Sequence, residues 1–319
     1  MTTSSNHISV SVVMAVYDEI DNVRITIESV LAQQDIELEF LVVSDGASTE
    51  VQEYLESIDD SRFKLIYQDH AGLTRALIKA CNMAKNPLIA RIDAGDIMLE
   101  GRLSAQAKMF TKRPSIVFVA CWVRVETDEG YYLYTVNDTS EQIDRALRAI
   151  DLDDFKTPFH SSTMFRKSAY QQVGGYRWQF YFAQDADLWS RMLQVGDFFM
   201  LEKTLTKAIF SVSGISGRYN KQQQALKELV VKANALRHKD QNDDIVLNQA
   251  EQYRPDKENE SHGAENEFDT VYFLAKVMHD QKSPHAREYW YRALKLNPWS
   301  LKVWGFTVLS FFFAAKPSV

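Results

Sequence analysis

The chain has 319 residues, 45% hydrophobic and 25% charged, a composition typical of a folded protein with a large α/β domain and an appendage. The formal net charge of −7 argues against a protein that grips nucleic acid through its overall field, which needs clustered Lys and Arg. Cys81 and Cys121 lack metal-site spacing and are expected in a core, in a reducing compartment. The polar first ten residues do not resemble a signal peptide, which favours a cytoplasmic location.

Strands and helices alternate through the first hundred residues. The apolar, β-branched run Ile8–Val16 predicts a strand buried on both faces. This alternation predicts βαβ crossovers and a mostly parallel sheet, whose ligands lie beyond the carboxyl ends of the strands. Three further strands are expected at Leu38–Val43, Phe63–Tyr67 and Leu88–Ile92, and the intervening helices at Asn22–Gln33, Thr49–Ile58 and Leu73–Ala84.

The second half continues as mixed α/β structure with a helical end. Residues Lys239–Asn266 are polar and acid-rich without apolar periodicity, which favours a linker or a flexible loop. The segment Glu267–Ala315 predicts two or three helices, interrupted at prolines. Before these, strands are expected at Ile116–Val125, Tyr131–Thr135 and Ser161–Phe165, and helices at 102–111, Glu141–Ala149 and Asp185–Gln194.

Carboxylates follow three of the predicted parallel strands. Asp18 comes after the first strand, Asp45 after the second, and Asp93 with Asp96 after the fourth. Such carboxylates can accept hydrogen bonds from a base or a ribose and can hold a divalent cation against a diphosphate. Each of them could instead cap a helix or a turn, but the set as a whole favours a nucleotide diphosphate site.

Local sequence then resembles the family 2 glycosyltransferases, an inverting group with the GT-A fold. The resemblance spans about residues 8–215. It implies a Rossmann-like, mostly parallel mixed sheet flanked by helices, with a helical C-terminal extension. The matching segments are VSVVMAVYDE, IESVLAQ, LEFLVVSDGAS and GLTRALIKACNMAKNPLIARIDAGDI in the first hundred residues, and HSSTMFRKSAYQQVGGYRWQFYFAQDADLWSRML from His160 onward.

The resemblance implies the division of the chain and the roles of its site residues. Residues 1–215 would form the catalytic domain, 216–266 a helix and polar linker, and 267–319 a helical tail. Asp185, in AQDADLW after a Gly-Gly-Tyr turn, would be the general base. Asp93 and Asp96 would hold Mn²⁺ or Mg²⁺. Contacts to the nucleotide-sugar are expected from Ala15, Tyr17, Asp18, Asp45, Arg75 and Asp93, and acceptor-side contacts from His160, Trp178 and Asp187.

Some positions depart from the family pattern. Gly95 stands where a metal-binding acid is expected, Ser44 replaces the first acid of D-D-G-S, Ile78 stands where Asn is frequent, and Gln184 precedes the base. Three of the acceptor-side and base residues also have structural readings: His160 as a half-buried core residue, Trp178 as core, and Asp185 as a helix cap.

The implied activity is transfer of a sugar from a nucleotide-diphosphate donor, with UDP-sugars foremost, to a hydroxyl of a saccharide or glycolipid in polysaccharide synthesis. A non-catalytic binding protein of the same fold and a sugar nucleotidyltransferase are the alternatives. The apolar segment near the C-terminus, LKVWGFTVLSFFFAAK, could lie on the inner face of a membrane or pack on the catalytic domain.

Overall fold

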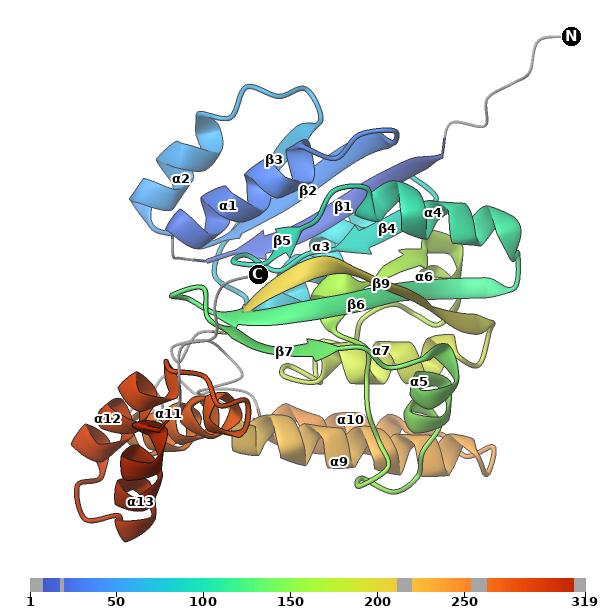
Figure 1. Cartoon of the computed structure of the whole chain (residues 1–319). Coiled ribbons are helices and arrows are strands. Elements are labelled where there is room, and N and C mark those ends of the chain that lie inside the picture. Colours follow the sequence, from blue (N-terminus) through green and yellow to red (C-terminus); the bar gives the residue numbers. More distant parts are fainter. Residues whose placement is uncertain (1–7, 18–19, 211–219, 254–262, 313–319) are drawn as a thin grey trace, which may run out of the picture. The chain divides into compact units, whose positions relative to one another are not determined.

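The computed structural model describes residues 8–17, 20–210, 220–253 and 263–312. Its described residues form a nine-stranded sheet with the order β3-β2-β1-β4-β8-β6-β9-β5, and β7 pairs with β6 (Figure 1). The strands are β1 Ser9–Val16, β2 Glu37–Asp45, β3 Phe63–Gln68, β4 Leu88–Arg91, β5 Ile97–Met98, β6 Ile116–Thr127, β7 Tyr132–Val136, β8 Met164–Arg166 and β9 Asp197–Phe210.

The alternating pattern of the first hundred residues forms the parallel part of the sheet. Strands β3, β2, β1 and β4 are parallel, whereas β8 pairs antiparallel with both β4 and β6. The helices in and around this part are α1 Ile20–Leu31, α2 Thr49–Glu56, α3 Leu73–Met83, α4 Arg102–Lys112, α5 Ser140–Leu147, α6 Lys167–Gln172 and α7 Gln184–Met192. The α/β fold with a mixed sheet and flanking helices is confirmed.

Each face of the sheet carries its own hydrophobic core. Along β1, Val12 and Met14 belong to one buried cluster and Val13 to the other, as the two-residue period of a strand requires. The first cluster also takes side chains from α1, α2 and α4, and the second takes them from α3, α5 and α7. Cys81 and Cys121 are free thiols buried within these elements.

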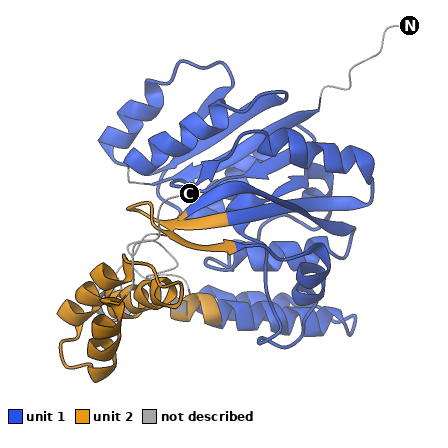
Figure 2. Cartoon of the chain, in the orientation of Figure 1, with its two compact units in different colours: residues 1–123, 136–208, 225–254 blue, residues 124–135, 209–224, 255–319 orange. Residues whose placement is uncertain are grey.

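The chain divides into two compact units (Figure 2). The first comprises residues 1–123, 136–208 and 225–254, and the second comprises 124–135, 209–224 and 255–319. The later helices are α9 Asn220–Arg237, α10 Asp244–Ala250, α11 Gly263–Asp280, α12 Ala286–Leu296 and α13 Leu301–Ser310, with short 3-10 turns at His160–Ser162 and Glu251–Tyr253. Among the helices that the structure describes, none has the length and apolar character to cross a bilayer.

The polar stretch 239–266 contains more order than its composition indicates. Helix α10 forms there because Val246 and Ala250 are fully buried, two apolar side chains one helical turn apart. Asp243, just before α10, pairs with both Arg177 and Arg237. The apolar pattern of the sequence did not predict this helix, because so short a helix is stabilised by tertiary contacts and not by its own sequence pattern.

The second unit joins the β6–β7 turn to the helical tail. The Glu129 carboxylate accepts hydrogen bonds from the Tyr289 hydroxyl and from Arg292 of α12. The rings of Tyr131 and His285 stack with their centroids 3.7 Å apart. Within the tail, the stacked rings of Trp290 and Phe306 join α12 to α13. The sequence placed this turn in the catalytic domain, and the structure groups it with the distant helices α11, α12 and α13.

Candidate active site

The carboxyl ends of β1, β2 and β4 lie at one edge of the sheet. Ala15 of β1 is in register with Val43 of β2, so these two strands end side by side, whereas Arg91, the last residue of β4, is in register with Val13 of β1. Ala15 is partly buried, and Tyr17 beyond it is 56% exposed. Asp18, which was expected to contact the donor, lies outside the described residues. At this edge Tyr17 and Asp45 both lie beside His70, and Asp93 follows the end of β4.

Asp45 fixes the loop between β3 and α3. Its buried carboxylate accepts hydrogen bonds from the backbone N–H groups of Ala71 and Gly72, both at 2.8 Å, and from Gln68 Nε2 at 2.6 Å. His70 Nδ1 lies 3.3 Å from the same carboxylate. Asp45 thus orients the start of α3 toward this edge of the sheet.

Aromatic side chains surround the start of α3. The rings of Tyr17 and His70 are 4.5 Å apart between centroids. A Cβ on Gly72, whose φ is +92°, would lie 2.5 Å from the Tyr181 ring, so only glycine permits this close packing. The Arg75 guanidinium lies over the Trp178 ring, 4.4 Å from its centroid. These contacts bring the segment before α7 against the β3–α3 loop and the start of α3.

The aromatic segment 178–182 has a mixed role. Phe180 and Phe182 are buried in the core, whereas Trp178 and Tyr181 are only partly buried. The two phenylalanines are therefore core residues. Trp178 and Tyr181 keep part of their surface exposed while contacting Arg75 and Gly72.

Asp93 forms an ion pair with Arg91, a buried residue that the sequence analysis did not identify as part of the site. Arg91, at the end of β4, has no exposed surface, and its guanidinium pairs with Asp93. Two of its nitrogens, Nε and Nη1, have no hydrogen-bond partner among the described residues. The Asp93 side chain itself is 37% exposed. A buried cation held against a half-exposed carboxylate fixes that carboxylate at the edge of the sheet.

The turn after β4 explains the glycine at position 95. Gly95 adopts a φ of +99°, a conformation that L side chains rarely adopt. Its N–H donates to Thr26 Oγ1 of α1 at 2.9 Å, and the Thr26 hydroxyl also lies 2.8 Å from the Asp96 carbonyl. Gly95, which departs from the family pattern, therefore lies in a turn that is hydrogen-bonded to α1 through Thr26.

The two acids of this turn differ in exposure. Asp93 is partly exposed, whereas Asp96 is buried. Burial lowers the pKa of the nearby Arg102 guanidinium, and the negative charge of Asp96 opposes this effect without reversing it. No three His, Cys, Asp or Glu side chains converge into a metal-binding group in the part of the chain that the structure describes. A donor set of one or two carboxylates fits Mg²⁺ or Mn²⁺ when phosphate oxygens of a substrate complete the coordination.

Asp185 begins α7 and is partly buried. Burial raises the pKa of its carboxyl, and the negative charge of Asp93 acts in the same direction. The positive charge of Lys227, on α9, acts against this rise. Asp185 is therefore close enough to Asp93 for their charges to interact, and it has a second charged neighbour, Lys227, that the sequence did not indicate. A carboxyl with a raised pKa is suited to accept a proton.

Asp187 lies on the opposite side of α7 and is fully buried. Its Oδ2 accepts two hydrogen bonds from Arg191, at 2.6 and 3.1 Å, and Arg191 also donates to the Val173 and Gly175 carbonyls. The expected contact to an acceptor would require exposed surface, which Asp187 lacks. The ion pair instead fastens the Gly-Gly turn to α7.

His160 lies in a core network. Its Nε2 is 2.7 Å from the Tyr176 hydroxyl, and its ring packs edge-on against Trp189. Burial, with the nearby charge of Arg91, lowers the pKa of His160 well below its usual value. The ring is therefore neutral at physiological pH, and its contacts match the structural reading of this residue.

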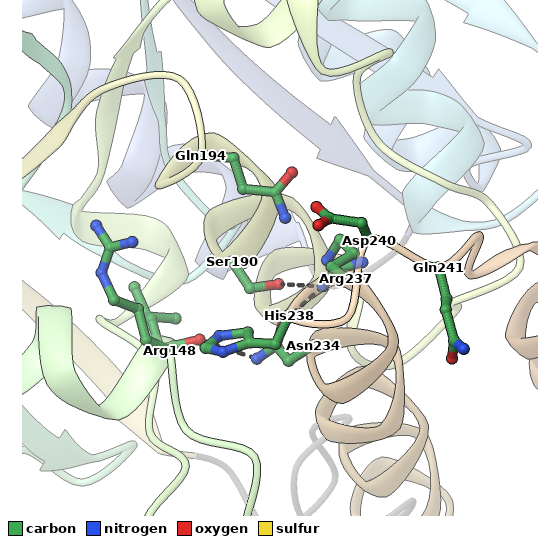
Figure 3. Close-up of a pocket in the computed structure, with 9 residues that line it drawn as sticks. Arg148, Ser190, Gln194, Asn234, Arg237, His238, Asp240 and Gln241 are labelled. Atoms are coloured by element: carbon green, nitrogen blue, oxygen red, sulfur yellow. Dashed lines mark hydrogen bonds between the residues drawn. The ribbon is translucent and has the colours of Figure 1, made fainter.

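A cavity of about 420 Å³ lies at the other end of α7 (Figure 3). Polar side chains line it, and Arg237 donates to Ser190 and Asn234 there. None of the residues that the sequence placed in the donor or acceptor site lines this cavity. The cavity is therefore separate from the candidate site at the strand ends and the start of α7.

Comparisons with known proteins agree with this geometry. The model of glycosyl transferase family 2 matches residues 11–174. The O-antigen biosynthesis glycosyltransferase WbnJ of Escherichia coli is 28% identical over 191 residues, which cover 58% of this chain and 71% of that protein. The chain spans less than two thirds of the length of two further similar glycosyltransferases, from Rickettsia bellii and Rickettsia prowazekii.

Two solved structures share the fold. TarS of S. aureus (residues 1–349) superposes with a TM-score of 0.52 at 12% identity, covering 95% of this chain and 89% of that one. The mannosyltransferase PcManGT of Pyrobaculum calidifontis, solved with GDP-Man and Mn²⁺, superposes with a TM-score of 0.55 at 13% identity, covering 97% of this chain and 86% of that one.

Proposed function

The chain belongs to the family 2 glycosyltransferases, and from this membership we propose that it transfers a sugar from a nucleotide-diphosphate donor, foremost a UDP-sugar, to a hydroxyl of a saccharide or lipid-linked acceptor with inversion at the anomeric carbon. A glycosyltransferase of glycan biosynthesis is supported by the family match and by the relatives. This family match favours a glycosyltransferase over the sugar nucleotidyltransferase, and the transfer assay below tests the non-catalytic alternative.

The observation that carries the mechanism is the position of Asp185. Its partly buried carboxyl has a raised pKa and feels the charge of Asp93, which lies on the donor side. In the proposed step the acceptor hydroxyl gives its proton to Asp185, and its oxygen attacks the anomeric carbon. The bond from that carbon to the diphosphate oxygen breaks, and the nucleoside diphosphate leaves with the electron pair.

Donor recognition is assigned to the edge of the sheet. We place the nucleoside near Ala15, Tyr17 and Asp45, beside the loop that Asp45 holds, and the sugar near Arg75 and Trp178. Asp18 is assigned to the same region by its place after β1. Polar loop groups and partly exposed rings are the groups that nucleotides and sugars bind. In this assignment residues 1–215 bind the donor, and the following segments 216–266 and 267–319 support the acceptor side.

A divalent cation is assigned to Asp93, with Asp96 as its second candidate ligand. When bound, such a cation neutralises the charge that develops on the departing diphosphate. A related fold solved with Mn²⁺ and a nucleotide-sugar supports this assignment. Asp93 is held in place by the buried guanidinium of Arg91, so the chain supplies a preoriented ligand.

The test replaces Asp185 by Asn in the full chain. The amide keeps the shape of the side chain but accepts no proton, so transfer is expected to fall by about 10²- to 10⁴-fold with little change in donor affinity. Donors are first identified by the hydrolysis of a panel of nucleotide-sugars with Mn²⁺, and donor affinity is measured by calorimetry. Asp197→Asn, at the exposed start of β9, is the matched control. Near-normal transfer by Asp185→Asn would place the base elsewhere.

A further inference from the structure

The last described helix, α13, has its apolar side chains on the outside. Leu301, Trp304 and Val308 recur every three or four residues along one face and are 86%, 50% and 56% exposed. The face continues beyond the helix and before it. We call this set the tail surface: Trp299, Leu301, Trp304, Val308, Leu309, Phe311 and Phe312, each at least half exposed.

The opposite face of α13 is small and partly polar. Val303, Thr307 and Ser310 are buried against the rest of the tail. The Thr307 hydroxyl donates to the Val303 carbonyl at 2.8 Å, and the Ser310 hydroxyl donates to the Thr307 carbonyl at 2.6 Å. Their polar groups are therefore satisfied within the helix. The helix buries Thr307 and Ser310, and although Phe306 packs on Trp290, most of its large apolar side chains are exposed, which water disfavours.

Basic side chains accompany the tail surface. Between residues 286 and 312 the chain has four cations and one carboxylate, Glu288; Arg292 is paired with Glu129 of the β6–β7 turn, which leaves Arg287, Lys295 and Lys302 as the local positive excess. This local positive excess stands in a protein whose net charge is −7. Lys295 and Lys302 are exposed. Arg287 lies over the Phe311 ring, 4.4 Å from its centroid. Cations beside exposed aromatic side chains complement a surface that is apolar inside and anionic outside.

We propose that the tail surface docks on a bilayer containing anionic lipids, with its Trp, Phe and Leu side chains among the acyl chains and its cations at the headgroups. Trp and Phe with flanking Lys and Arg are the side chains that interfacial helices use. A contiguous apolar surface of this kind marks an interaction site. The positive excess selects an anionic bilayer over a neutral protein surface.

The proposal does not depend on the donor or on the catalytic base. It places the enzyme at the surface where a lipid-linked acceptor would be presented. Because vesicle binding requires no turnover, failure of the donor assignment and failure of the docking surface are separately measurable.

The experiment measures sedimentation of the full chain with phosphatidylcholine vesicles, with and without phosphatidylglycerol. The wild type should bind the anionic vesicles more tightly. Val308→Glu should weaken this binding by at least about tenfold, because it removes one exposed apolar side chain that would enter the bilayer and adds a negative charge. Ile245→Glu, at a 59% exposed apolar residue of α10, is the matched control and should bind as the wild type does.

A second readout locates the contact. Brominated lipid should quench the fluorescence of the wild type, and quenching should fall in the double variant Trp299→Phe, Trp304→Phe, which keeps the surface apolar and should still sediment with the vesicles. Leu301→Glu repeats the charge test at the first helical position, where an acidic residue suits the helix dipole, in case Val308→Glu does not fold.

Several results would overturn the proposal. One is the absence of sedimentation with anionic vesicles. Another is equal binding by the wild type, Val308→Glu and Leu301→Glu. A wild-type dimer that Val308→Glu converts to a monomer, with no vesicle binding, would assign the tail surface to a second copy of the chain. A large loss of thermal stability in both Glu variants, again with no vesicle binding, would indicate that the first compact unit covers the tail surface.

Discussion

Removal of the Asp187 carboxylate should destabilise the catalytic unit, because it leaves a buried guanidinium without its counter-ion. Asp187 has no exposed surface, and the Arg191 side chain is 4% exposed. Arg191 reaches the carboxylate with two nitrogens, at 2.6 and 3.1 Å. It also donates to two carbonyls of the Gly-Gly turn, so its position is fixed from both sides. In Asp187→Ala the cation has no route to water without moving this turn.

The size of the effect follows from the burial. Breaking a buried ion pair by removing one partner costs about 3–5 kcal/mol. For a unit of this size, each kcal/mol lowers Tm by roughly 2–4 °C, so Asp187→Ala should lower Tm by about 6–20 °C. Asp187→Asn keeps one acceptor oxygen for Arg191 and should fall between the wild type and the alanine variant.

The control is a second Asp–Arg pair with the same spacing. Asp144 and Arg148 are also four residues apart on a helix, with an N–O distance of 3.0 Å, but both are exposed. Removing Asp144 should cost about 0.3–0.5 kcal/mol, since exposed helical pairs contribute no more than that. Thermal unfolding followed by circular dichroism compares the two alanine variants directly. Equal Tm values for Asp187→Ala and Asp144→Ala would refute the argument from burial.

Three further results are expected. Lys227→Met removes a positive charge that lowers the pKa of Asp185, so the acidic limb of the pH–rate profile should move to higher pH. Lys232→Met, on the same helix, should leave the profile in place. Identical profiles for the two variants would show that Lys227 does not affect the base. Gly72→Ala puts a Cβ 2.5 Å from the Tyr181 ring, so calorimetry should show weaker donor binding and a lower Tm, and wild-type values would count against this packing. Excess chelator should abolish donor binding, and unchanged affinity would argue against a cation at the end of β4.

The sequence predicts the parallel half of the fold closely. The strand expected at Ile8–Val16 is β1, Ser9–Val16, and the helix expected at Leu73–Ala84 is α3, Leu73–Met83. Both are buried elements whose period of two or 3.6 residues is written in their apolar positions. The family match confirms the resemblance drawn from these segments.

The site is less fully written in the sequence. The pairs Asp187–Arg191 and Asp144–Arg148 have the same four-residue spacing, but only the first is buried. The sequence does not show this difference, because the burial of a pair depends on elements far away in the chain. Arg91 was part of the quoted motif, yet only the structure shows that its guanidinium supports Asp93 from inside the core. The sequence signal that could have pointed to Arg91 is a charged residue within the predicted buried strand Leu88–Ile92, two residues before Asp93.

Lys227 carried no such signal. It stands in a segment after the family match ends, on a helix that the sequence treated as the approach to a linker. Its effect on Asp185 arises from tertiary packing. Local patterns do not report which face of a later helix returns to an earlier site.

The turn between β6 and β7 has a consequence for synthesis of the chain. Glu129 bonds to Tyr289, 160 residues later. At about 5–20 residues per second, a ribosome needs roughly 8–32 s to reach that partner. During this interval the nascent hairpin presents a carboxylate and a tyrosine ring whose eventual neighbours do not yet exist, while the sheet around it can already form. Slowing translation between these two positions should therefore lengthen the exposure of the hairpin to chaperones and proteases, and leave the earlier strands unaffected.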